Sequence, residues 1–438
     1  MPDGPAQPRN PLLERLFRRI DELTPELVAL TQDLVRIPTV NPPGEVYTDC
    51  AEFVGRRLKQ WGYEVVYLRG EGERGDSDRY PRTNVLGRVA GQGGGPTIHF
   101  NSHIDVVQTG EGWTVDPFAA LLKNGRIYGR GTCDMKGGMA ASMVAIEAIL
   151  AEGIAFPGAF EISGTVDEES GGFAGVGWMA KQGYFSKPRV DYVVIPEPLH
   201  KDCVCLGHRG VWWGEVETLG RIAHGSMPYL GVSAIRSMTR FLEKIEKELY
   251  PKLEGRKTAM PVIPEGSRRS TLNINSIHGG QVERDRAVNA APSPVVADSC
   301  RLVLDRRYLI EEEPEQVRQE IVDLLEACKR EHNDFQYKLS EILHFAPNMT
   351  EAESPLVVAL DREIERVFGH ASKHVVSPGT YDQKHVQRVG HLKDCVAYGP
   401  GILDLAHQPD EYVEVADLVG SAKVMAAASL RLMGVIDD

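Results

Sequence analysis

The sequence lacks long apolar segments and has few cysteines. No stretch approaches the roughly 20 consecutive apolar residues of a membrane-spanning helix, and the charged N-terminal stretch lacks the apolar run of a signal peptide. The seven cysteines are scattered and odd in number, which is typical of reduced thiols rather than of a disulfide framework. We therefore predict a cytoplasmic protein with no membrane partner.

Basic residues are also in deficit. The chain has 49 Lys and Arg against 62 Asp and Glu, a formal net charge of -13. Such a charge repels nucleic acids and anionic membranes, so we predict a small-molecule partner and no nucleic acid. Part of the acidic excess can be neutralised locally if carboxylates bind cations.

What is present is an alternation of helical and strand patterns. Residues 10–37 have helical spacing. Buried-strand patterns at 84–91 and 97–107 are followed by helical ones at 135–153 and 172–183. This order predicts an α/β fold, with a mainly parallel sheet flanked by helices.

The pattern changes near Val211. Residues 211–221 alternate like a half-exposed strand, and a long helix is predicted at 231–250, followed by two further strands and a helix. We interpret residues 210–330 as an inserted α+β domain. It separates the first part of the catalytic domain, 1–209, from the second part, 331–438.

The strongest local motif is HIDVV, at the end of a predicted buried strand. His103 and Asp105 are two residues apart and therefore leave the same face of the strand. His103 can bind a metal while Asp105 orients its ring. The alternative is a structural histidine capped by an acidic strand end.

Three further segments carry acidic residues at places where α/β proteins hold ligands. Asp134 lies between a glycine-containing turn and a helix, although a helix N-cap is the alternative. Glu168 and Glu169 crowd together after a predicted strand, where a cation would offset their charge, or they belong to a solvated loop. Glu197 lies between two prolines at a strand tip.

His407 precedes the C-terminal helix and, by itself, is more typical of a structural histidine. The candidate residues taken together indicate a metal site more strongly than any one of them does. His103, Asp134, Glu169, Glu197 and His407 supply the imidazole and carboxylate ligands that a pair of zinc-class ions needs. Glu168 would then be free to accept a proton from the activated water and return it to the leaving amine.

These motifs resemble, in the same order along the chain, those of the aminoacylase and carboxypeptidase G2 group of dinuclear zinc amidohydrolases. That group includes acetylornithine deacetylase and succinyl-diaminopimelate desuccinylase. The motifs are HID, GRGTCDMKGG, DEESGG, PEP and AHQPDE. The resemblance implies that one ion is bound by His103 and Glu197, the other by Glu169 and His407, and that Asp134 bridges them.

The resemblance also implies roles outside the metal ligands. Glu168 is expected to be the general acid and base, with Asp105 orienting His103. The inserted domain is expected to be a lid that also forms a homodimer, and its His224 to stabilise the oxyanion, in its own site or that of the neighbouring subunit. Substrate-binding roles are implied for Asn289, Arg307, Gly379 and Thr380.

One segment departs from the family pattern. Several deacylases have a GGTSDxRF-like loop for the substrate carboxylate, whereas this chain has SPGTYDQKHV, with Lys384 at the arginine position. Lysine lacks the planar fork that suits a carboxylate. Tyr381, Lys384 and His385 therefore favour a bulkier or aromatic acid as the substrate.

The predicted function is hydrolysis of an amide bond in an N-acyl amino acid or related small carboxylate, with two divalent ions, zinc or else cobalt or manganese. A dipeptidase or an aromatic-amine aminohydrolase would use the same site. A non-catalytic binding module is disfavoured by Glu168, which a pure binder would not need. A phosphate-binding enzyme is disfavoured because the glycines at 91–95 are not followed by a P-loop Lys and Ser or Thr.

Overall fold

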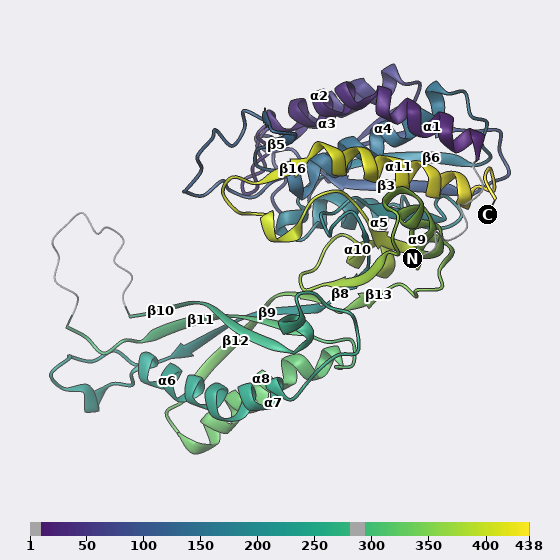
Figure 1. The fold of residues 1–438 in the computed structure, drawn as a ribbon. Coiled ribbons are helices and arrows are strands. Elements are labelled where there is room, and N and C mark those ends of the chain that lie inside the picture. The colour runs from purple at the N-terminus through teal and green to yellow at the C-terminus, as the bar shows by residue number, and fades with distance from the viewer. Residues whose placement is uncertain (1–9, 281–293, 438) are drawn as a thin grey trace. The chain divides into compact units, whose positions relative to one another are not determined.

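The computed structural model describes residues 10–280 and 294–437. They divide into two compact units, whose helices and strands are labelled in Figure 1. Unit 1 contains residues up to 207, 349–375 and 381 onward, and unit 2 contains residues 208–348 and 376–380. None of the helices in the described residues is long and apolar enough to span a bilayer.

Unit 1 is built on a mixed sheet. Within the described residues its strands lie in the order β1, β2, β6, β3, β7, β15, β8 and β13, and β14 also pairs with β8. The pairs from β6 through β3 and β7 to β15 are parallel, so the predicted fold class is confirmed. The strands are β1 (Glu64–Arg69), β2 (Thr83–Ala90), β3 (Thr97–His103), β6 (Ala159–Thr165), β7 (Tyr192–Ile195), β8 (Cys203–His208), β13 (Asn348–Met349), β14 (Lys373–Ser377) and β15 (Cys395–Ala397).

Helices cover this sheet. β3 and β6 are buried at every residue, as parallel strands between two helical layers are. The predicted helix at 10–37 is divided in two near Leu23, where Pro25 can occupy only the first turn of a new helix. The helices are α1 (Pro11–Glu22), α2 (Thr24–Val35), α3 (Tyr47–Gln60), α4 (Gly137–Ala151), α5 (Trp178–Lys181), α9 (Pro355–Phe368), α10 (Gln383–Arg388) and α11 (Val415–Leu432).

A small antiparallel sheet completes unit 1. It consists of β4 (Leu121–Lys123), β5 (Arg126–Tyr128) and β16 (Tyr412–Glu414). Its pairing joins the segment before Asp134 to the segment after His407. Two stretches almost 300 residues apart in sequence are thereby held side by side.

Unit 2 is an antiparallel sheet packed against helices. The strand order is β10 (Thr271–Gly279), β11 (Ser299–Tyr308), β9 (Gly210–Leu219), β12 (Gln336–Phe345). Alternate residues of β9, among them Trp212 and Val216, join a core with α6 (Ala234–Lys244), α7 (Tyr250–Glu254) and α8 (Pro314–Glu331).

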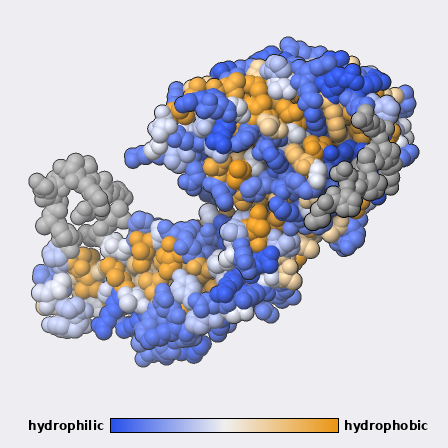
Figure 2. Space-filling model, viewed as in Figure 1, coloured by the Kyte–Doolittle hydropathy of each residue, from blue (hydrophilic) through white to orange (hydrophobic). Residues whose placement is uncertain are grey.

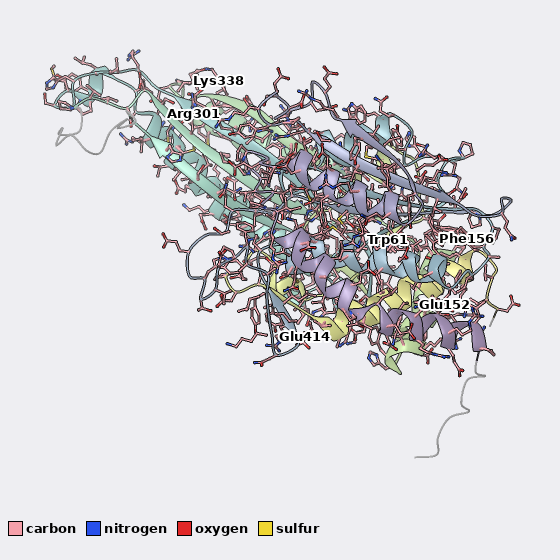
Figure 3. The ribbon with its side chains drawn as sticks, turned by 90° about the horizontal axis from the view of Figure 1, so that it is seen from above. Trp61, Glu152, Phe156, Arg301, Lys338 and Glu414 are labelled. Carbon is pink, nitrogen blue, oxygen red and sulfur yellow. The ribbon has the colours of Figure 1, made fainter. Side chains whose placement is uncertain are left out.

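The opposite face of this sheet carries charge. Glu217 of β9 lies directly between Arg301 of β11 and Lys338 of β12, both labelled in Figure 3. Its carboxylate is 3.3 Å from the Arg301 guanidinium and 3.4 Å from the Lys338 ammonium. The predicted inserted domain ended at residue 330, whereas β12 pairs with β9 and continues the sheet to Phe345.

Candidate metal centre

His103 is the last residue of β3, where the buried strand opens toward the candidate site. Its Nδ1 lies 2.9 Å from the backbone carbonyl of Asp105 and 3.6 Å from the Asp105 carboxylate. An Nδ1 proton donated to that carbonyl leaves Nε2 as the ligand atom. Nε2 is 3.0 Å from Asp134 Oδ1 and 3.8 Å from Glu197 Oε1.

Asp134 is held by backbone contacts to a buried glutamate. One carboxylate oxygen of Glu411 accepts hydrogen bonds from the N–H groups of Gly131, Cys133 and Asp134, at 3.0, 2.8 and 3.2 Å. The other contacts the guanidinium of Arg130, and both side chains are buried. The turn that carries Asp134 is therefore held in place by Glu411, while the Asp134 carboxylate contacts His103.

His407 approaches Asp134 from the other side. Its Nε2 is 3.3 Å from Asp134 Oδ2 and 3.1 Å from Glu169 Oε1. The two oxygens of Asp134 thus face two different histidines. Of the five predicted ligands, four are linked by successive contacts, from His103 to Asp134, from Asp134 to His407 and from His407 to Glu169. The fifth, Glu197, lies beside His103.

Glu168 and Glu169 lie on a tight turn after β6. The carboxylate of Asp105 accepts hydrogen bonds from the N–H groups of Glu168 and Glu169, at 3.2 and 3.1 Å, and from the side-chain amide of Asn41, at 2.8 Å. Asp105 therefore contacts both the His103 ring and the acidic turn. Glu168 Oε1 also contacts the Lys384 ammonium, at 3.2 Å.

The pKa values reflect crowded negative charge. Burial and the neighbouring Asp134 raise the pKa of Glu169 to about 7 and that of Glu197 well above its usual range. Burial opposes protonation of His103, yet its contacts with Asp134 and Glu197 raise its pKa well above the ordinary value. Hydrogen bonds to Asp134 and Glu169 raise the pKa of His407 to about 11. The site therefore attracts positive charge.

The donor set suits divalent ions of the zinc class, which accept imidazole nitrogen and carboxylate oxygen. His103, Asp134 and Glu169 each offer one ligand atom, and these atoms lie within 4.8 Å of one another. Because metal–ligand distances are about 2.0–2.2 Å, a cation among these atoms can reach all of them with small side-chain adjustments. The residues present therefore fit a metal centre.

Other predicted residues belong to unit 2. His224 is exposed, with its Nδ1 2.7 Å from Ser226 Oγ. Arg307 forms an ion pair with Asp305 at 2.7 Å. Gly379 and Thr380 are in the short segment 376–380. Asn289 is outside the described residues.

The interpretation of the SPGTYDQKHV segment needs correction. Tyr381, Lys384 and His385 are at most 5% exposed, and the lysine and histidine are on α10. Lys384 contacts Glu168, and His385 Nε2 lies 2.7 Å from the carbonyl oxygen of Gly171. Because these side chains are directed into unit 1, they do not support the preference for an aromatic acid.

Sequence reasoning missed several residues that hold the ligands in place. Glu411, Arg130 and Asn41 contact the backbone or side chains of the predicted site. Glu411 is in the AHQPDE motif, so a buried partner for the Asp134 turn could have been sought there. The role of Asn41 had no local signal, since it lies within a proline-rich segment 64 residues before Asp105.

Comparisons with known proteins show which family the sequence matches. The chain matches the family described as peptidase family M20/M25/M40 over residues 99–431. The succinyl-diaminopimelate desuccinylase of Thioalkalivibrio sulfidiphilus is 27% identical over 92% of this chain and 98% of the relative. A deformylase of N-formyl-4-amino-5-aminomethyl-2-methylpyrimidine from Halalkalibacterium halodurans is 27% identical over 94% of this chain and 96% of the relative.

The fold has solved counterparts. Human carnosine dipeptidase 1 superposes with a TM-score of 0.76 at 20% identity, over 98% of this chain and 100% of that one. The chain belongs to peptidase family M20/M25/M40. The predicted family and the predicted class of enzyme, a metal-dependent hydrolase of amide bonds, are thereby confirmed.

Proposed function

We propose that this chain hydrolyses the amide bond of an N-acyl amino acid, or of a related small carboxylate, with two bound divalent ions. The main support is the carboxylate of Asp134, whose two oxygens contact His103 and His407 separately. We assign one ion to His103 and Glu197 and the other to His407 and Glu169, with Asp134 bridging. Zinc is the proposed metal, with cobalt and manganese as alternatives.

When bound, the ions would supply Lewis acidity, polarising the substrate carbonyl and making water nucleophilic near neutral pH. The chain's residues provide the proton transfers. Glu168 Oε1 is engaged by Lys384, so we assign proton transfer to Oε2. This oxygen accepts a proton from water as the new C–O bond forms and passes it to the amide nitrogen as the C–N bond breaks. The second proton of the water moves to the amine as the acid product ionises, so the products are a carboxylate and an ammonium.

Asp105 and Asn41 would keep Glu168 in position for this proton transfer. The Asp105 carboxylate accepts hydrogen bonds from the backbone N–H groups of the turn residues Glu168 and Glu169, and the Asn41 amide donates to that carboxylate. A metal ligand and the proton carrier are adjacent residues on that turn, so one anchor orients both. For unit 2 we propose a lid role, with His224 stabilising the oxyanion and Arg307, Asn289, Gly379 and Thr380 binding the substrate.

We also propose a homodimer formed through unit 2 and a cytoplasmic location. Exposed apolar side chains gather on unit 2, and Figure 2 shows hydrophobic residues on its viewed face. Ile222, Tyr229, Leu230 and Ile277 are each at least 50% exposed, which is unusual for side chains that face only water. For the location, the support is that all seven cysteines are buried free thiols.

The proposed activity is tested with metal-loaded protein and a panel of N-acyl amino acids, dipeptides and N-formyl aromatic amines. We expect turnover of at least one N-acyl amino acid. Glu168→Gln should lower kcat by about 10² to 10⁴ and keep the wild-type ion content. Near wild-type turnover by Glu168→Gln would overturn the mechanism, and turnover confined to dipeptides or formylated amines would redirect the substrate assignment.

A further inference from the structure

Lys384 is a buried lysine in direct contact with the proposed proton carrier. Its side chain is 1% exposed, and its ammonium lies 3.2 Å from Glu168 Oε1. Glu168 is itself only 11% exposed. An ion pair in this setting is weakly screened by water, so removing one partner leaves the other charge buried without compensation.

Helix α10 fixes the base of the Lys384 side chain. The neighbouring Gln383 is buried, and its amide donates to the carbonyls of Leu206 and Cys395, at 3.0 and 2.6 Å. These bonds attach the first turn of α10 to strands β8 and β15. The direction in which Lys384 leaves the helix is therefore set by the sheet.

His385 contacts the same turn at a second point. Its Nε2 lies 2.7 Å from the carbonyl oxygen of Gly171, three residues after Glu168. The approach is close: a Cβ added at Gly172 would lie 2.7 Å from Asp382 Oδ1 and 3.1 Å from His385 Cδ2. Glycine at 172 therefore leaves room for His385 and for Asp382, the N-cap residue of α10, to pack close to the turn.

A role for Lys384 as the anchor of the substrate carboxylate conflicts with these contacts. The ammonium would have to leave Glu168 and rotate away from a turn against which its helix is packed. A substrate carboxylate next to Glu168 would also add negative charge to a site already rich in carboxylates. The contacts of Lys384 instead match a group that restricts the rotamers of Glu168.

We propose that Lys384 and His385 are positioning residues that hold Glu168 and its turn for proton transfer, and that Lys384 does not anchor the substrate carboxylate. This inference rests on the proposed function. His385 fixes the turn backbone, and Lys384 holds Oε1 so that Oε2 faces the reacting atoms. Specificity for the substrate carboxylate then resides elsewhere in the chain.

The kinetic test compares Lys384→Met, Lys384→Arg and the control Lys201→Met, which removes a lysine paired with Asp417 at the half-exposed edge of unit 1. Each is assayed with an N-acyl amino acid that the wild type hydrolyses and with the C-terminal amide of the same compound. We expect Lys384→Met to lower kcat by about 10- to 100-fold with KM within about threefold. The loss should be the same for both substrates.

Lys384→Arg should recover part of kcat, because it restores a buried cation and donor, and Lys201→Met should match the wild type. A carboxylate anchor would behave differently. Lys384→Met would then raise KM for the acid and leave the amide unaffected, which would overturn the proposal. A loss in Lys384→Met that persists in a Glu168→Gln background would overturn it as well, since positioning acts only through Glu168.

A structural measurement tests the positioning role of Lys384 independently of the proposed enzymatic activity. Crystal structures of zinc-loaded wild type and Lys384→Met should show the Glu168 carboxylate moved or disordered in the variant, with the ligands unchanged. An unchanged Glu168 would overturn the positioning role, whatever the substrate. If the wild type hydrolyses no amide in the panel while Glu168 moves as expected, the proposed function fails and the contact stands.

Discussion

Glu411 and Arg130 form a buried ion pair beneath the turn that carries Asp134. The guanidinium contacts one oxygen of Glu411, and the other oxygen receives three backbone N–H groups from the turn. Burial raises the pKa of Glu411 to about 7 although Arg130 lowers it. The contact with Arg130 and the three N–H groups favour the ionised form, which keeps the turn, and with it Asp134, in one conformation.

We expect Glu411→Gln to lower the affinity for Zn by about 10- to 100-fold, as loss of a group that orients metal ligands commonly does. Glutamine keeps the size but loses the charge that attracts the three N–H groups. Equilibrium dialysis with ZnCl₂ measures the effect. The matched control is Glu414→Gln, a half-exposed partner of Arg126 labelled in Figure 3, which should bind Zn as the wild type does. Equal affinities for the two variants would contradict the assigned role.

The metal-free protein should lose stability as pH rises from about 4.5 to 6.5. Burial raises the pKa of Glu169 and of Asp382 to about 7, so the folded state binds protons that the unfolded state has released. The pKa of His407 is raised to about 11, so it keeps its proton in the folded state. An unfolded histidine begins to release its proton as pH approaches about 6.5, so His407 adds to the loss of stability at the upper end of this range. Thermal melts in EDTA test this, and a constant or rising Tm would contradict it.

Added Zn should stabilise the protein more strongly as pH rises, opposite to the pH dependence of the metal-free protein. Metal binding requires ionised carboxylates and neutral imidazoles, so affinity increases with pH as protons are displaced. We expect the gain in Tm from saturating Zn to be larger at pH 7.5 than at pH 5.5. Glu169→Gln should reduce both the slope of the metal-free protein and the gain from Zn, which assigns the effect to the site.

Asp167, which precedes Glu168, forms a buried ion pair with Arg82 whose contribution to stability can be measured. Its carboxylate is 2.8 Å from Arg82 Nε and 2.9 Å from the Tyr47 hydroxyl. Arg82→Met should lower the free energy of unfolding by about 3–5 kcal/mol, because it leaves a buried carboxylate without its cation. Tyr47→Phe removes one hydrogen bond and should cost about 1 kcal/mol. Urea denaturation compares the two, and equal effects would contradict the ion pair's importance.

Alanine substitutions at Gly172 and Gly183 distinguish the cost of a left-handed backbone from the cost of a steric clash. It has φ +72°, and Gly183 has a similar φ of +83° but no atom within 4 Å of an added Cβ. Gly183→Ala should therefore show only the left-handed backbone cost of about 1–2 kcal/mol. Gly172→Ala should lose more stability and also activity, because its Cβ displaces Asp382 and His385. Similar losses in the two variants, measured by urea denaturation and turnover, would show that α10 tolerates displacement.

The residues that meet at the candidate metal centre could be predicted because each belongs to a local pattern. His103 ends an apolar strand, and Asp134 and Glu169 follow glycine-rich or strand-to-turn segments, places where α/β proteins hold ligands. The strands and helices around them have clear periodicities, and their order predicts the parallel part of the sheet. Local sequence is sufficient there because each residue acts through its own strand or turn.

The contacts between distant segments could not be predicted in the same way. Lys384 was interpreted as facing the substrate because it belongs to a motif associated with substrate binding. Its direction depends on the packing of α10, which involves Gln383 and carbonyls from two strands. A sequence motif indicates where a residue lies along the chain, and the tertiary contacts decide which way its side chain points. Glu411 was missed for the same reason, since its partners are backbone groups about 280 residues away.

The two histidines differ greatly in their access to water. The side chain of His407 is 48% exposed, whereas that of His103 is 1% exposed. If each holds one ion as proposed, the two ions will exchange with solution at different rates. Brief treatment with a chelator would remove the ion near His407 first. The protein would then keep one ion, bound beside the buried His103.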